Sequence, residues 1–287
     1  MIIGYTTGVF DMFHIGHLNI LRKAKEQCDF LIVGVSTDEL VQHDKNKTPI
    51  IPFENRCAIV EAIRYVDKVV PQPDKNKLGA WKKYHFNKMF VGSDWKGTET
   101  WIEFEEQFKP LDVEIVYLDH TDGISSTILR DRLITDVNHG IGGGGNSSTI
   151  GYTTGVFDMF HIGHLNILKR AKERCDYLIV GVSTDECVFS YKHKKPIVPY
   201  EERMKIVGAI RYVDEVVSQE SMDKVEFLKK HHFDVMFHGD EWKGTELYNY
   251  YEAEFAKMNA RIEYLSHTEG ISSTILRSKI ADYNNFD

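Results

Sequence analysis

The sequence of 287 residues lacks the features that mark secreted or membrane-spanning proteins. It contains no apolar run near the ~20 residues needed to cross a bilayer. Met1–Tyr5 has neither the basic nor the apolar zone of a signal peptide, so we expect a cytoplasmic protein with no membrane span. With 42% hydrophobic and 27% charged residues, the composition is that of a globular chain.

Positive charge and cysteine are also scarce. The net charge of −8 does not suit nucleic-acid binding, which relies on clustered Lys and Arg to displace counterions. It remains compatible with a small anion in a local basic pocket. The four cysteines form no C-x-x-C pair, which argues against a disulfide framework or a zinc site.

The most informative feature is an internal duplication. Ile3–Arg130 aligns with Ile150–Arg277 without a gap, and Ile3–Leu21 is identical to Ile150–Leu168. Solenoid repeats have periods of about 20–50 residues, so a repeat of this length is a whole domain. We predict domain 1 at residues 1–138, a Gly-rich flexible linker at 139–148 and domain 2 at 149–287. The linker resembles a phosphate-binding loop only weakly, because no Lys-Ser/Thr follows it.

Each repeat alternates apolar strands with helically spaced segments. In the first repeat we predict strands at Ile2–Tyr5, Phe30–Ser36, Lys68–Val70, Met89–Val91 and Glu114–Leu118, and helices at His17–Gln27, Phe53–Ile63, Leu78–Tyr84, Trp101–Phe108 and Ser126–Leu133. Such alternation predicts an α/β fold with a parallel sheet and right-handed crossovers. Ligands of such sheets bind beyond the carboxyl ends of the strands.

The loop after the first strand carries two histidines. Gly8 and Gly16 allow a close approach of the backbone to a ligand, and the following helix N-terminus suits a phosphate. His14 and His17 would share one face of the first helical turn and donate hydrogen bonds to a phosphoryl group. An H-x-x-H pair can also bind zinc, but no third ligand recurs at a suitable spacing.

A second constellation lies near the end of each repeat. It reads His120-Thr-Asp-Gly-Ile-Ser-Ser-Thr in the first repeat and His267-Thr-Glu-Gly-Ile-Ser-Ser-Thr in the second. The hydroxyl groups at the start of a helix predict a second phosphate-binding end, although an ordinary Ser/Thr N-cap has the same pattern.

Together, these segments resemble the H-x-G-H and R-T-E-G-I-S-T-S signatures of the cytidylyltransferase family. The resemblance covers nearly all of each repeat and is strongest for the glycerol-3-phosphate enzymes. Ser36-Thr-Asp-Glu39, Arg64-Tyr-Val-Asp67 and Gly92-Ser-Asp-Trp-Lys-Gly97 also support it. It implies two tandem Rossmann-like nucleotidyltransferase domains, each a parallel sheet flanked by helices, with CTP, Mg²⁺ and a small phosphorylated alcohol as ligands.

The resemblance also implies roles for individual residues. His14 and His17 would stabilise the transition state, Lys47 and Lys45 would bridge the two phosphates, and Arg64 would help to read the cytosine. Lysines in a polar loop are often merely solvated, and a pair between Arg64 and Asp67 is an alternative to the cytosine contact. Asp11 would place a magnesium–triphosphate complex, with no direct protein ligand to the metal, or would be an N-cap.

The residues implied in catalysis are His14, His17, Lys47, His161, His164 and Lys194. Those implied in nucleotide binding are Thr7, Gly8, Val9, Phe10, Asp11, Arg64, Gly92, Asp94, His120, Thr121, Ser125 and Ser126, with Thr154, Gly155, Val156, Phe157, Asp158, Arg211, Gly239, Glu241, His267, Thr268, Ser272 and Ser273 in the second repeat. Lys45 and Lys192 are assigned to the acceptor, and Asp11 and Asp158 to the neighbourhood of magnesium.

Three positions depart from the family pattern. His120 and His267 replace the Arg that opens the second signature, which weakens a phosphate contact or makes it pH-dependent. Val9 stands where relatives often have Thr. Asp94 is matched by Glu241, so the two pockets need not be equal.

We therefore predict transfer of CMP from CTP to a phosphorylated alcohol, with glycerol 3-phosphate favoured. The alternatives are a cytidylyltransferase for ethanolamine phosphate, choline phosphate or another polyol phosphate, an ATP-using adenylyltransferase, and a nucleotide-binding regulatory module without turnover. We also expect the two repeats to pack together as an internal pseudo-twofold dimer.

Overall fold

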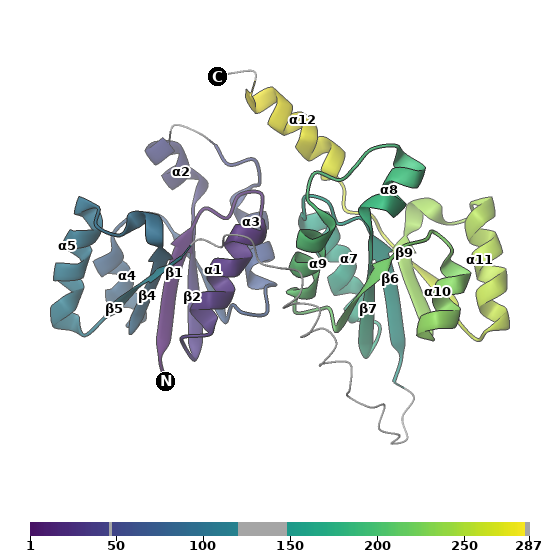
Figure 1. The fold of residues 1–287 in the computed structure, drawn as a ribbon, viewed down its shortest axis with the longest axis horizontal. Helices are drawn as coiled ribbons and strands as arrows, with labels where there is room; N and C mark the ends of the chain where they lie inside the picture. The colour runs from purple at the N-terminus through teal and green to yellow at the C-terminus, as the bar shows by residue number, and fades with distance from the viewer. Residues whose placement is uncertain (46–47, 120–147, 285–287) are drawn as a thin grey trace.

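A computed structural model describes residues 1–45, 48–119 and 148–284 of the chain (Figure 1). The first repeat contains strands β1 (Ile3–Gly8), β2 (Phe30–Ser36), β3 (Lys68–Gln72), β4 (Lys88–Gly92) and β5 (Glu114–Leu118). Its helices are α1 (Ile15–Lys25), α2 (Asp38–Lys45), α3 (Phe53–Glu61), α4 (Lys77–Tyr84) and α5 (Glu99–Phe108).

The second repeat follows the same order. Its strands are β6 (Ile150–Gly155), β7 (Tyr177–Ser183), β8 (Glu215–Gln219), β9 (Val235–Gly239) and β10 (Arg261–Leu265). Its helices are α7 (Ile162–Lys172), α8 (Asp185–Lys192), α9 (Tyr200–Gly208), α10 (Lys224–His231), α11 (Glu246–Lys257) and α12 (Ser273–Asn284).

Each repeat forms a five-stranded parallel sheet. The strand orders are β3-β2-β1-β4-β5 and β8-β7-β6-β9-β10, which are the same topology. The order reverses between β1 and β4, and between β6 and β9. This switch point is where an open α/β sheet leaves a crevice at its carboxyl edge. The predicted α/β fold with two Rossmann-like domains is confirmed.

Helices cover both faces of each sheet. On one face of the first sheet, α4 and α5 enclose a cluster that includes Tyr5, Phe86, Trp101 and Phe108. On the other face, α1 and α3 pack on the apolar residues of β2, and this cluster continues into the second repeat. The core therefore joins the two repeats.

Reciprocal hydrogen bonds also join the repeats. The Arg64 backbone N–H donates to the Ala209 carbonyl, and the Arg211 N–H donates to the Ala62 carbonyl, both at 2.9 Å. An antiparallel bridge pairs Ile63 with Ile210. Across this contact α1 packs on α9 and α3 packs on α7, and Figure 1 shows these helices between the two sheets. The repeats thus pack as a pseudo-twofold pair within one chain.

Some elements differ from the sequence predictions. The structure adds α2 and its copy α8, which the sequence analysis treats as polar loop, so Lys45 and Lys192 end helices. Most other boundaries shift by a few residues. The predicted helix Ser126–Leu133 and most of the predicted linker lie outside the described residues. Within the described ranges, no helix is both long and apolar enough to span a bilayer.

Candidate active site

The first loop of each repeat lies at the switch point of its sheet. It leaves β1 at Gly8 and enters α1 at Ile15. Phe10 and Met12 have positive φ angles of 56° and 48°, which are uncommon for side chains of this size. The second repeat repeats both angles at Phe157 and Met159. Backbone strain of this kind persists only where the surroundings fix the loop.

The predicted histidine pairs come together in both repeats. The ring centroids of His14 and His17 lie 3.8 Å apart and the rings are stacked, as are those of His161 and His164, also at 3.8 Å. Each pair occupies the N-terminus of a helix, where unpaired N–H groups and a partial positive charge favour an anion.

Hydrogen bonds fix the tautomer of three of these rings, those of His14, His161 and His164. Nδ1 of His14 accepts from the Gly16 N–H, and Nδ1 of His161 accepts from the Gly163 N–H, both at 3.1 Å. Nδ1 of His164 accepts from the His161 N–H at 3.4 Å. A nitrogen that accepts carries no proton, so Nε2 carries it and remains a donor in the neutral ring.

Burial keeps the imidazoles uncharged. It lowers the pKa of His17 to about 3, with a smaller contribution from His14. Burial likewise lowers the pKa of His161 to about 4, aided by His267, and the pKa of His164 lies well below its ordinary value. At neutral pH the pairs therefore act as neutral N–H donors and not as cations.

Asp11 anchors the end of the lysine loop, which is the stretch that runs from Lys45 at the end of α2 past Lys47 to the start of α3. Its Oδ2 accepts from the Ile50 N–H and its Oδ1 from the Ile51 N–H, both at 2.9 Å. Asp158 holds the matching segment of the second repeat in the same way. Asp11 and Asp158 thus connect the histidine loop of each repeat, which joins the first strand to the first helix, to the end of its lysine loop.

The second phosphate-binding segment is described only in the second repeat. Ser272 Oγ accepts from the Ile275 N–H at 3.2 Å and so caps α12. Ser273 Oγ donates to the Asp158 carbonyl at 2.8 Å, and Thr268 Oγ1 accepts from Asn166 Nδ2 at 3.1 Å. Gly270 has a φ of 77°, as its turn requires. These contacts dock the segment against the His161 loop.

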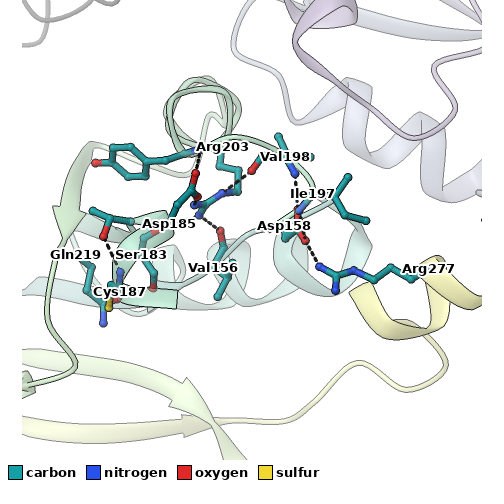
Figure 2. Close-up of polar contacts among 12 residues, drawn as sticks. Val156, Asp158, Ser183, Asp185, Cys187, Ile197, Val198, Arg203, Gln219 and Arg277 are labelled. Carbon is teal, nitrogen blue, oxygen red and sulfur yellow. Dashed lines mark hydrogen bonds and ion pairs between the residues drawn. The ribbon is translucent and has the colours of Figure 1, made fainter. Parts of the chain in front are cut away.

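Two buried arginines hold the loops of the site together, and the sequence analysis missed them. The side chain of Arg203 is fully buried, and its guanidinium donates to the carbonyls of Val156 and Val198 and pairs with Asp185 at 2.5 Å (Figure 2). Arg56 makes the corresponding contacts in the first repeat. The sequence feature that could have indicated them is an arginine at the same position of both repeats, among apolar residues of a predicted helix.

Two buried lysines were also missed. Lys77 and Lys224 start α4 and α10 and are 8% and 3% exposed. Burial lowers the pKa of each to about 8. Lys77 Nζ donates to Thr7 Oγ1 at 3.0 Å, which places the ammonium beside the last residues of β1. A charged group held in the interior at the sheet's carboxyl edge needs an anionic partner.

Lys77 borders a cavity of about 230 Å³. Gln72 at the end of β3, Asp74 just after it, Tyr5 of β1 and Tyr84 of α4 also line this cavity. It therefore offers a cation, a carboxylate and aromatic surface within one small space.

The side chains of Arg64 and Arg211 form hydrogen bonds across the contact between the two repeats. Arg64 Nη2 donates to the carbonyls of Val213 at 2.8 Å and Ile210 at 3.2 Å in the other repeat. Arg211 makes the reciprocal bonds to Val66 and Ile63. These bonds give the two arginines a role in joining the repeats, and the predicted contact with cytosine stays a prediction.

The remaining predicted residues are spread over three loops. Gly92 ends β4 and Asp94 follows it, while Gly239 ends β9 and Glu241 follows it. Both strand ends lie at the switch point, and the Glu241 carboxylate lies against Gly239. Lys192 and Lys194 are exposed. Five predicted residues lie outside the described residues: Lys47, His120, Thr121, Ser125 and Ser126.

The two sites are not identical. His238 precedes Gly239 at the end of β9, where the first repeat has Val91. Burial and the nearby charge of Lys224 lower the pKa of His238 to about 4. Its Nδ1 is buried without a hydrogen-bond partner among the described residues. Only a comparison of the two repeats would single out this position.

The arrangement is suited to transfer of a nucleotidyl group. Neutral N–H donors and helix N-termini bind a polyphosphate, and a lysine lies nearby for a second anion. In the described part of the chain, no group of three or more His, Cys, Asp or Glu side chains is placed to hold a metal ion. A parallel α/β sheet with an H-x-G-H pair at its switch point defines the class of nucleotidyltransferases.

Comparisons with known proteins identify the family. The cytidylyltransferase-like family model matches residues 5–132 and 152–279, which are the two repeats. A probable ethanolamine-phosphate cytidylyltransferase of Encephalitozoon cuniculi is 32% identical, over 98% of this chain and 95% of that protein. The ethanolamine-phosphate cytidylyltransferase of Dictyostelium discoideum is 28% identical, over 97% and 90%.

A single-domain relative matches one repeat. The glycerol-3-phosphate cytidylyltransferase of Bacillus subtilis is 41% identical over 45% of this chain and 95% of its own length. The chain belongs to the cytidylyltransferase-like family and is a nucleotidyltransferase of the cytidylyltransferase type.

Proposed function

We propose that the chain transfers CMP from CTP to ethanolamine phosphate, giving CDP-ethanolamine and pyrophosphate. The observation that carries this acceptor is the match over the whole tandem chain to two ethanolamine-phosphate enzymes. The glycerol 3-phosphate preference of the sequence analysis has support only from matches to a single repeat. We therefore propose ethanolamine phosphate as the acceptor, in place of the glycerol 3-phosphate that the sequence alone favours.

The cavity beside Lys77 supports a zwitterionic acceptor. The Lys77 ammonium suits the phosphate, while Asp74 and the tyrosine rings suit the cationic end of ethanolamine phosphate. In the second repeat, Asp223 lies near Lys224 and raises its pKa against the effect of burial. Each repeat therefore pairs one buried lysine with one nearby aspartate. Glycerol 3-phosphate has no positive group that could pair with this aspartate.

The proposed step is a direct in-line displacement. A phosphate oxygen of the acceptor attacks the α-phosphorus of CTP, a new P–O bond forms, and the bond to the β-phosphate oxygen breaks. A phosphate monoester is already an anion, so no strong general base is needed. Catalysis then rests on positioning and on stabilising charge. The imidazole Nε2–H groups of His14 and His17 would donate to the phosphoryl oxygens.

Magnesium fits this scheme as an ion carried by the triphosphate. Both carboxylate oxygens of Asp11 accept backbone N–H groups, and Asp158 also pairs with Arg277. These carboxylates are thus occupied in orienting loops. Bound Mg²⁺ would neutralise charge on the leaving pyrophosphate.

The acceptor is tested by competition in one reaction. CTP and Mg²⁺ are supplied with equal concentrations of ethanolamine phosphate, choline phosphate and glycerol 3-phosphate, and the products are resolved by mass spectrometry. The proposal predicts CDP-ethanolamine as the dominant product. Dominant CDP-glycerol would return the assignment to the glycerol type. A parallel reaction with ATP tests the adenylyltransferase alternative.

A further inference from the structure

The space beside the buried lysine differs between the two repeats. In the first repeat, Ala80 of α4 is one of the residues that line the cavity of about 230 Å³ next to Lys77. In the gapless alignment of the repeats, the residue that matches Ala80 is Phe227 of α10. The two sites therefore differ in side-chain volume at one position beside the proposed acceptor phosphate.

The Phe227 ring occupies the corresponding place in the second repeat. Its centroid lies 4.7 Å from that of Tyr152 and 4.3 Å from that of His231, and it is stacked on both rings. Phe227 is 8% exposed and belongs to the same apolar cluster as Tyr152. Aromatic rings stacked at such distances are in direct contact, so no ligand group fits between Phe227 and either ring.

Ala80 leaves aromatic surface of the first repeat open to the cavity. The Tyr5 ring stacks on Phe86 at 4.7 Å, and the ring of Tyr84 lies 6.0 Å from it. Both tyrosines line the cavity. A cation within about 6 Å of an aromatic centroid is attracted to the ring, and quaternary ammonium groups are bound in this way. The first repeat therefore offers tyrosine rings to an ammonium group where the second repeat holds a phenylalanine side chain.

The charges around this cavity suit an acceptor that carries both a phosphate and an ammonium group. Lys77 and Asp74 both line it. Burial raises the pKa of Tyr5, and the nearby Tyr84 and Asp74 raise it further, so a carboxylate lies close to the same ring. An ammonium group beside Tyr5 would thus have an opposite charge within reach while the phosphate meets Lys77.

We propose that this position sets how bulky an ammonium group each site accepts: the first site, with Ala80, accepts N-methylated ethanolamine phosphates up to choline phosphate, and the second site, with Phe227, excludes them. This inference rests on the proposed function and names the range of acceptors at each site. Methylation enlarges the ammonium group and keeps its positive charge, so the limit that Phe227 imposes is steric. One methyl group too many in a closely fitting pocket changes kcat/KM by about 10- to 200-fold.

The two sites are measured one at a time in the full chain. His161→Ala/His164→Ala isolates the first site, and His14→Ala/His17→Ala isolates the second. The acceptors are ethanolamine phosphate and its N-methyl, N,N-dimethyl and N,N,N-trimethyl forms, of which the last is choline phosphate. At the first site we expect kcat/KM values that agree within about tenfold across the series. At the second site we expect kcat/KM for choline phosphate to be lower than that for ethanolamine phosphate on the order of 100-fold.

Substitution at position 80 tests the cause of this difference. Ala80→Phe should lower kcat/KM of the first site for choline phosphate on the order of 100-fold, and retained turnover of ethanolamine phosphate shows that the variant is folded. Lys82→Phe adds the same side chain at an exposed position of α4 outside the cavity and should leave the acceptor profile unchanged.

The reverse change should widen the second site. Phe227→Ala should raise its kcat/KM for choline phosphate about tenfold or more. Because truncation of a buried phenylalanine destabilises a core, Phe227→Leu is measured beside it and should raise the same value in part.

The outcomes separate this inference from the proposed function. The same profile along the methylation series at both unaltered sites would overturn the inference, as would an Ala80→Phe first site that still uses choline phosphate as well as before. In either case, CDP-ethanolamine formed at both sites leaves the proposed function standing. If neither single-site protein forms a CDP product with any of the four acceptors, the proposed function itself fails.

Discussion

Replacing Arg64 by Ala distinguishes two roles for this residue. In the structure its guanidinium donates to the carbonyls of Val213 and Ile210, both buried residues of the other repeat. Hydrogen bonds from a charged donor contribute about 1.5–3 kcal/mol, and each buried acceptor left unpaired adds a desolvation cost. We expect a loss of about 3 kcal/mol, which corresponds to roughly 5 °C in Tm for a chain of this size.

Differential scanning calorimetry measures this loss, with Arg22→Ala as the control. Arg22 makes an exposed pair with Glu26 one helical turn away, and such pairs contribute about 0.3–0.5 kcal/mol. Arg211→Ala should match Arg64→Ala because its contacts are reciprocal. An unchanged Tm together with a higher KM for CTP would refute the interface role and restore the cytosine contact predicted from the sequence.

Three further predictions concern the acceptor pockets. Lys77→Met combined with Lys224→Met should raise KM for the acceptor about 10- to 100-fold with CTP binding retained, because a charged contact of about 1.5–3 kcal/mol is lost. Initial rates at varied acceptor and fixed CTP concentration measure this KM. An unchanged KM would exclude the two lysines from acceptor binding. Burial lowers the pKa of both lysines to about 8, so each ammonium loses its charge as pH rises through that value. The kcat/KM for the acceptor should therefore fall about tenfold per pH unit above pH 8. A pH profile that stays flat to pH 10 would contradict this prediction. Val91 and His238 occupy a position that differs between the repeats. The exchanges Val91→His and His238→Val should exchange the acceptor KM values of the two sites, each measured with the other histidine pair replaced by Ala. Values that stay with their repeat would show that this position does not set them.

Much of the fold follows from the sequence because its signals are local. The gapless repeat shows two domains, and the continuous apolar run Phe30–Ser36 marks a strand buried on both sides. The helix Asp38–Lys45 was missed because its residues are mostly polar and give no apolar stripe. Its first residue, Asp38, pairs with the buried Arg56 of α3, which is a tertiary contact that no local pattern shows.

The site was predictable where chemistry and spacing coincide, as in the stacked pair His14 and His17. Lys77 was missed because nothing local separates a buried lysine from a solvated one. The contacts of Arg64 were missed for another reason: they depend on how the repeats dock, and pairing with the neighbouring Asp67 was the simpler alternative. In the structure Asp67 instead pairs with Lys25 at 2.7 Å.

The central claim is that each repeat holds a working site built around its histidine pair. The most direct measurement is the rate of pyrophosphate release with CTP, Mg²⁺ and ethanolamine phosphate for four proteins: the unaltered chain, His14→Ala/His17→Ala, His161→Ala/His164→Ala, and the chain with all four changes. The account predicts partial activity in each double variant and none in the last. Full activity in the four-residue variant, or no turnover of CTP with ethanolamine phosphate by the unaltered chain, would contradict it.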